Sequence, residues 1–82
     1  MKYRKKPVEI EAIQWTGDNL TEVMAFCPKV HPDDMTSLLV IETPEGILYA
    51  QEEDYIIKGF DGEFYPCNPS VFLAAYDEVD AQ

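Results

Sequence analysis

Apolar and polar side chains alternate near the start of the chain. In the segment PVEIEAIQWT, residues 7–16, valine and isoleucine alternate with Glu9 and Glu11. This period of two is typical of a half-buried β-strand. Ile13 and Trp15 fall on the same face as the glutamates. We therefore expect this strand either to bulge before Trp15 or to have both of its faces partly covered.

The spacing of apolar residues then changes and predicts a helix over about residues 19–27. Asn19 is a suitable N-cap, Glu22 follows three residues later as in a capping box, and Pro28 ends the helix. Four apolar residues have the spacing of a single helix face: Leu20, Val23, Met24 and Cys27. The segment KVHPDDMTS that follows, residues 29–37, has the composition of a loop.

The second half of the chain predicts two β-hairpins. In LLVIETPEGILYA, residues 38–50, a central Thr-Pro-Glu-Gly has proline and glycine where a type I turn prefers them. In residues 54–66, the strands DYIIKGF and EFYP flank Asp61 and Gly62, a pair that supplies the positive φ angles of a tight hairpin turn.

A short C-terminal helix is expected after the second hairpin, because Asn68 can cap it and Pro69 suits its first position. The predicted fold is one α+β domain over residues 1–82. It consists of an antiparallel sheet of about 4–5 strands, formed by the two hairpins and the N-terminal strand, with one main helix on one face.

Charge narrows the range of partners. The chain of 82 residues has a net charge of −10, and its basic residues concentrate at the start as Lys2, Arg4, Lys5 and Lys6. Such an acidic body repels phosphate backbones, so we do not expect generic binding to nucleic acids. The charge remains compatible with a basic protein partner, with mimicry of nucleic acid, or with solubility alone.

The location is expected to be the cytoplasm. The N-terminal segment lacks the apolar core of a signal peptide, and no window has the roughly 18 apolar residues of a membrane helix. We expect Cys27 and Cys67 to be free thiols, since nothing in the sequence indicates secretion.

Few residues are suited to catalysis. His31 is the only histidine, and with Asp33 and Asp34 it offers fewer ligands than metal sites generally have. Cys67 and His31 form the only conceivable Cys–His pair, but they lie in different segments. We therefore expect a protein that is not an enzyme and has no metal or cofactor, with a small hydrolase using Cys67 or His31 as an alternative.

Residues 54–72 are the most patterned block in the chain. Along its first strand, Tyr55 falls on one face while Lys58 and Phe60 fall on the other. Aromatic rings and a cation could together hold a small anionic ligand; equally, the block could serve only to build the fold. The candidate ligand-binding residues are Arg4, Trp15, Tyr55, Lys58, Phe60 and Tyr65.

Two segments carry a resemblance to a known family. MKYRKKPVEIEAIQWTGDN at the start and DYIIKGFDGEFYPCNPSVFLAAYD near the end are similar to a family of small, largely uncharacterised proteins encoded by phages and prophages, chiefly of Gram-positive bacteria. Together the segments cover about half of the chain. Residues 20–53 carry no such signal, and Glu52-Glu53 stands where the family usually has Pro-Gly.

The resemblance implies an accessory protein that acts in the cytoplasm of the bacterial host. It supplies no catalytic residues. The leading hypothesis is a non-enzymatic binding protein that antagonises an antiviral defence, either by sequestering a nucleotide-like signal or by binding a host protein. A structural component of the virion or of its assembly is a further alternative. The oligomeric state is left open.

Overall fold

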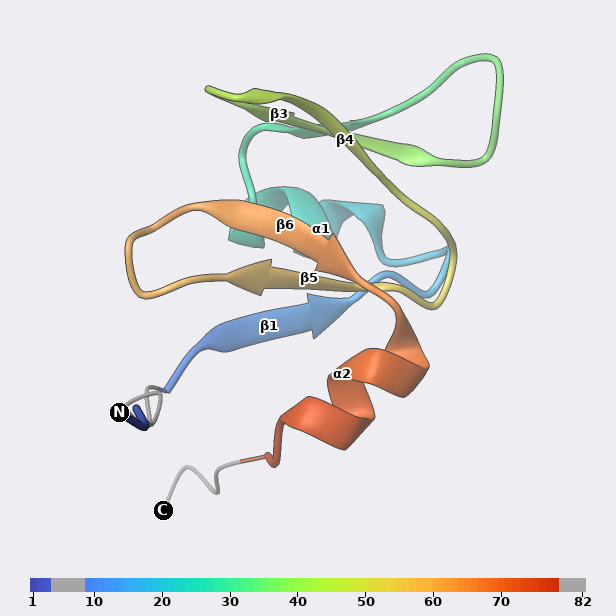
Figure 1. Ribbon diagram of the computed structural model, residues 1–82. Helices are drawn as coiled ribbons and strands as arrows, with labels where there is room; N and C mark the ends of the chain where they lie inside the picture. The colour runs from blue at the N-terminus through green and yellow to red at the C-terminus, as the bar shows by residue number, and fades with distance from the viewer. Residues whose placement is uncertain (4–8, 79–82) are drawn as a thin grey trace.

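Residues 1–3 and 9–78 are described in a computed structural model (Figure 1). Strands and helices follow one another along the chain in this order: β1 (Glu11–Gln14), α1 (Leu20–Phe26), β2 (Val30–Pro32), β3 (Leu39–Thr43), β4 (Gly46–Ala50), β5 (Tyr55–Lys58), β6 (Phe64–Cys67) and α2 (Pro69–Ala75). The predicted α+β class and antiparallel pairing are confirmed.

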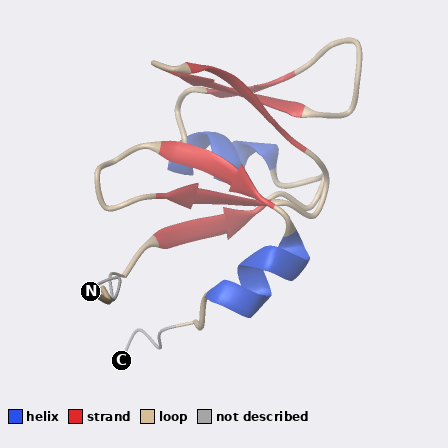
Figure 2. Cartoon of the chain, viewed as in Figure 1, coloured by secondary structure: helices blue, strands red, loops and turns tan. Residues whose placement is uncertain are grey.

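The strands form two sheets rather than the single sheet that the sequence predicted. The first sheet has the order β1-β5-β6, and the second has the order β2-β3-β4. Figure 2 shows the strands as two separate groups. The N-terminal strand β1 pairs with β5, which lies far from it in the sequence, and Gln14 is opposite Tyr55. Because β5 is paired on both sides, the first hairpin cannot join it and builds a separate sheet with β2.

Strand β2 was wrongly predicted to be loop. Its residues pair with β3, with Val30 opposite Ile41, and Val30 is buried. A loop was predicted because of Pro32 at the end of the segment, since proline is usually unfavourable in a strand. An edge strand tolerates proline, since the missing N–H would point away from the sheet, and β2 is such an edge.

Helix α1 lies within the predicted range, but its start is held differently. The Asn19 side chain accepts no hydrogen bond from the backbone N–H groups of the first helical turn. Its oxygen accepts from the Thr16 N–H at 3.0 Å, and its amide donates to the Gln14 carbonyl at 2.9 Å. Asn19 thus fastens the connection between β1 and α1. Met24, expected on the buried face, is exposed.

Both predicted hairpins are confirmed. Thr43 lies opposite Gly46 in the first, and the Thr43 hydroxyl donates to the Gly46 carbonyl at 2.6 Å. The second hairpin differs in its turn, which is longer than the tight Asp61-Gly62 turn that the sequence predicted. The Gly59 N–H donates to the Glu63 carbonyl at 2.8 Å, and Asp61 does not have the predicted positive φ. Gly62 has a φ of +85°, an angle that glycine adopts without the steric cost of a Cβ.

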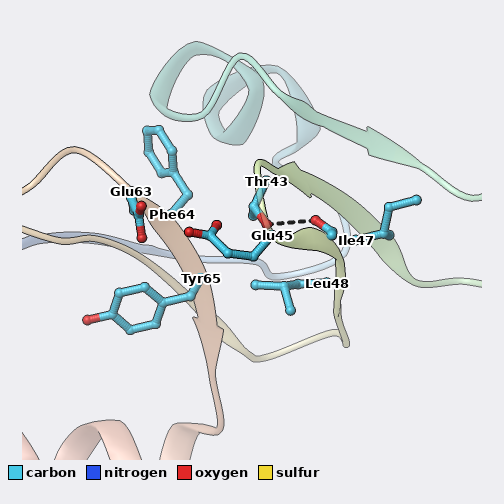
Figure 3. A pocket seen from close by; sticks show the side chains of 8 residues that line it. Thr43, Glu45, Ile47, Leu48, Glu63, Phe64 and Tyr65 are labelled. Atoms are coloured by element: carbon cyan, nitrogen blue, oxygen red, sulfur yellow. Dashed lines mark hydrogen bonds between the residues drawn. The ribbon is translucent and has the colours of Figure 1, made fainter.

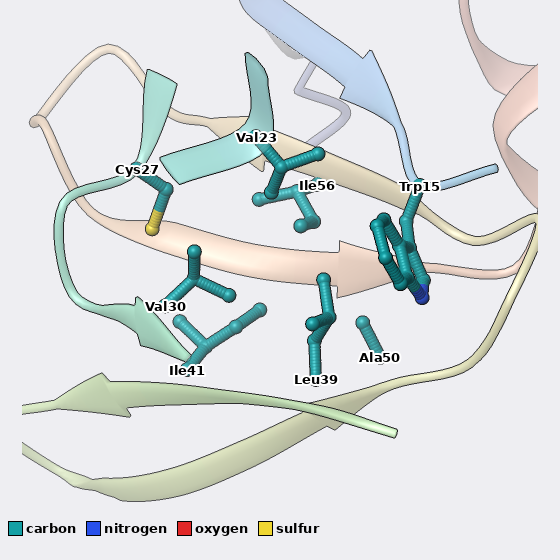
Figure 4. Close-up of a cluster of buried hydrophobic side chains, with 8 residues drawn as sticks. All are labelled: Trp15, Val23, Cys27, Val30, Leu39, Ile41, Ala50 and Ile56. Carbon is teal, nitrogen blue, oxygen red and sulfur yellow. The ribbon is translucent and has the colours of Figure 1, made fainter. Parts of the chain in front are cut away.

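The core lies between α1, the second sheet and one face of the first sheet (Figure 4). Side chains alternate along β5, so Ile56 points into this core while Ile57 points to the opposite face; both are fully buried. Helix α2 covers that opposite face, where the rings of Tyr55 and Phe72 stack with centroids 4.0 Å apart. The buried cluster consists of Trp15, Val23, Cys27, Val30, Leu39, Ile41, Ala50 and Ile56.

A tight turn over residues 51–54 joins the two sheets. The Asp54 N–H donates to the Gln51 carbonyl at 3.0 Å, and Glu53 has a φ of +81°. Among the described residues, no other non-glycine residue has a positive φ. A type II turn requires such an angle at its third residue and prefers Pro-Gly at its centre.

We expect Glu53→Gly to stabilise the protein. A left-handed conformation costs a non-glycine residue about 1–2 kcal/mol, and glycine does not have this steric cost. Glycine loses more backbone entropy on folding, so the net gain in stability is smaller than the steric cost that is removed. The urea midpoint, followed by the fluorescence of Trp15, should therefore rise. Glu52→Gly is the matched control, because Glu52 has no positive φ, and it should bring no gain. Equal midpoints for the two variants would contradict the assignment of strain to Glu53.

Candidate functional site

The aromatic residues predicted to bind a ligand lie on different faces of the first sheet. Trp15 is in the core, with only 7% of its surface exposed. Tyr55 is on the opposite face, stacked against Phe72 of α2. The two rings therefore cannot hold one flat ligand between them. Arg4, the cation proposed to assist them, lies outside the described residues.

Lys58 and Phe60 are at the exposed end of the second hairpin. Lys58 lies opposite Glu11 on one side and Phe64 on the other, yet among the described residues it makes no ion pair. Phe60, in the turn, is 83% exposed. The described members of the predicted set thus do not converge on one site.

The residues of the hydrolase alternative are also separate. His31 Nε2 lies 3.3 Å from the Glu42 carboxylate, and His31 and Cys67 share no hydrogen bond. Both cysteines are free, as predicted. Burial raises the pKa of the Cys27 thiol, which makes the reactive thiolate scarcer. In residues 1–3 and 9–78, no three of the His, Cys, Asp and Glu side chains are grouped to hold a metal ion.

A groove of about 200 Å³ lies between the second sheet and the edge of the first (Figure 3). It is bounded by the β3–β4 turn and the start of β4 on one side, and by the start of β6 on the other. Figure 3 shows the Leu48 side chain pointing toward β6. The lining includes Thr43, Glu45, Leu48, Glu63, Phe64 and Tyr65.

The floor of the groove is fixed by the fold. Phe64 packs against the core, and its ring meets that of Phe26 edge to face at 5.7 Å. The hydrogen bond between Thr43 and Gly46 holds the turn that carries Glu45. The groove therefore has an apolar base that packs against the core, with a hydrogen-bonded turn beside it.

Negative charge gathers at the rim. The pKa of Glu63 is raised above its usual value, chiefly by the carboxylate of Glu45 and also by that of Asp61. A cation placed between like charges removes the repulsion that disfavours the charged form of Glu63. The rim is thus suited to a basic group and unsuited to an anion.

Beside the groove, β4 exposes three consecutive large apolar residues. Ile47 is 57% exposed, Leu48 37% and Tyr49 53%. Of the residues predicted from sequence, only Tyr65 borders the groove. One feature of the sequence could have indicated the exposed residues of β4: the segment GILYA, residues 46–50, has no charged residue. In a strand with one face at the surface, apolar side chains normally alternate with polar ones.

In comparisons with known proteins, no protein-family model, no curated protein and no solved structure matches the chain. In the described part of the chain, none of the helices is long and apolar enough to span a membrane.

Proposed function

We propose that the chain is a phage- or prophage-encoded, non-enzymatic protein that binds a basic host protein in the bacterial cytoplasm, and that this capture antagonises an antiviral defence. The observation that carries the binding role is the groove, where an apolar floor is bordered by the mutually repelling carboxylates of Glu45 and Glu63. The phage origin rests on the resemblance of the two terminal segments.

A host protein suits the groove better than a nucleotide-like signal. Pockets for small ligands typically enclose about 300–1,000 Å³ and bury most of the ligand, whereas this groove has about 200 Å³. That space accommodates one or two side chains of a partner. A phosphate would also approach two carboxylates at the rim, in a chain with a net charge of −10.

The experiment is capture of partners from a host lysate by the immobilised protein at low salt. We expect basic proteins to bind, and about 0.5 M salt to release them, because added ions screen charge attraction. Glu63→Lys should lose them. Asp34→Lys, the same change of charge at an exposed position in the loop before β3, should retain them. Binding should also weaken as the pH falls through the raised pKa of Glu63, because protonation removes its charge.

Two outcomes would contradict the proposal. The first is equal capture by Glu63→Lys and the wild-type chain, which would place binding elsewhere. The second is a nucleotide-like molecule recovered by mass spectrometry from the denatured protein, which would favour the small-ligand hypothesis. Detection of the chain in purified virions would instead support a structural component.

A further inference from the structure

Strand β4 has one edge that is not paired. It is hydrogen-bonded to β3 on one side and stands last in the order of the second sheet. Among the described residues, no backbone hydrogen bond joins β4 to a strand other than β3. The other edge therefore presents a row of N–H and C=O groups to which a further strand could pair.

The register identifies which groups point outward. The Glu42 N–H donates to the Lys29 carbonyl at 3.3 Å, on the side of β3 away from β4. Ile47, opposite Glu42, is therefore in a non-hydrogen-bonded pair, so its own N–H and C=O point away from β3. The alternation places the N–H and C=O of Tyr49 on the same free edge.

The other edge strands carry features that discourage pairing. Strand β6 contains Pro66, β2 contains His31 and Pro32, and β1 begins with the exposed Glu11. Charge and proline are the usual protections of exposed edges. Within the described sheets, β4 is the edge strand that has neither, and it exposes Ile47, Leu48 and Tyr49.

We infer that β4 is the docking edge for an extended, lysine- or arginine-containing segment of the partner protein, which adds to the second sheet as a fourth strand. This inference rests on the proposed function and names the partner's chemistry. An added strand lies about 4.7–4.9 Å from its neighbour. Its apolar side chains cover those of β4, and a basic side chain enters the groove between Glu45 and Glu63.

Charge favours such a partner over a second copy of this chain. If two copies paired antiparallel about Leu48, Glu45 of one copy would lie opposite Gln51 of the other, beside Glu52. Each copy also has a net charge of −10. Like charges across an interface oppose pairing, whereas a basic segment relieves the repulsion between Glu45 and Glu63.

The test uses two labelled decapeptides, one alternating valine with lysine and the other valine with glutamate. We expect only the lysine peptide to bind, as measured by fluorescence anisotropy. Tyr49→Pro should weaken its binding by about tenfold or more, because it removes one outward N–H and obstructs the edge. Tyr49→Ala keeps the N–H and should retain more affinity. Hydrogen exchange at the Ile47 and Tyr49 amides should slow when the lysine peptide is added.

Ile47→Lys provides a second variant in case Tyr49→Pro does not fold. It places a like charge at an exposed position of the edge and should also weaken binding of the lysine peptide. If the peptide binds without slowing exchange at Ile47 and Tyr49, strand addition is wrong while the proposed function stands. Failure of the lysine peptide to bind at millimolar concentration overturns the inference, and the lysate capture then decides the proposed function separately. Light scattering that shows a dimer, with both amides already protected, would assign the edge to a second copy.

Discussion

Ile56→Ala is expected to remove most of the free energy of unfolding of the protein. Ile56 is fully buried in the central strand of the first sheet and belongs to the core cluster. Truncating a buried isoleucine typically costs about 2–5 kcal/mol. A chain of this length usually has only about 3–5 kcal/mol of net stability. The loss is therefore comparable to the whole free energy of unfolding.

Ile47→Ala is the matched control for Ile56→Ala. It removes the same atoms from a side chain that is 57% exposed, where substitutions usually change stability by about 0.5 kcal/mol or less. Both variants can be followed in urea through Trp15, the single tryptophan of the chain. A midpoint for Ile56→Ala equal to that of Ile47→Ala would show that β5 does not have the buried position described.

Trp15→Ala is expected to be equally damaging, and it tests whether this residue is scaffold or binding group. Removing a buried tryptophan side chain typically costs about 3–5 kcal/mol, because it leaves a large cavity. Trp15→Phe should be milder. It keeps a ring in the core and removes an indole N–H that is buried without an acceptor among the described residues, and such a donor is itself costly to bury.

Circular dichroism during heating is the measurement for the Trp15 variants, because the fluorescent reporter is lost. Phe60→Ala serves as the comparison: another aromatic residue from the predicted set, 83% exposed in a turn. Its melting temperature should stay close to that of the wild type. If Trp15→Ala had the same melting temperature as Phe60→Ala, the core would not depend on Trp15, and a role of Trp15 in ligand binding would again be the better interpretation.

Local signals predicted the elements well, because they act over a few residues. The apolar spacing around Val23 and the turn residues Pro44 and Gly62 have direct physical roles, and the corresponding helix and hairpins are present. The strand at Val30 was missed because its pairing depends on a partner strand that follows a loop. Short strands are determined more by tertiary contacts than by their own composition.

The candidate site was harder to predict for the same reason. Lys58 and Phe60 were predicted to bind a ligand because a cation and an aromatic ring are groups that often contact ligands. Glu45 and Glu63 are ordinary surface glutamates in sequence, and only the packing of the first hairpin beside β6 brings their charges together. The same packing decides that Tyr65, but not Tyr55, borders the groove.

The pairing of β1 with β5 also has a consequence for the order of folding. Hairpins such as β3–β4 and β5–β6 close locally, on a timescale of about 1–10 μs. Strand β1 can join β5 only after the intervening chain has been drawn together, so we expect the first sheet to be completed last. Loop closure costs only about 0.6 kcal/mol for each doubling of length. The loop between β2 and β3 can therefore lengthen at small thermodynamic cost, while β1 and β5 must keep the register that joins them.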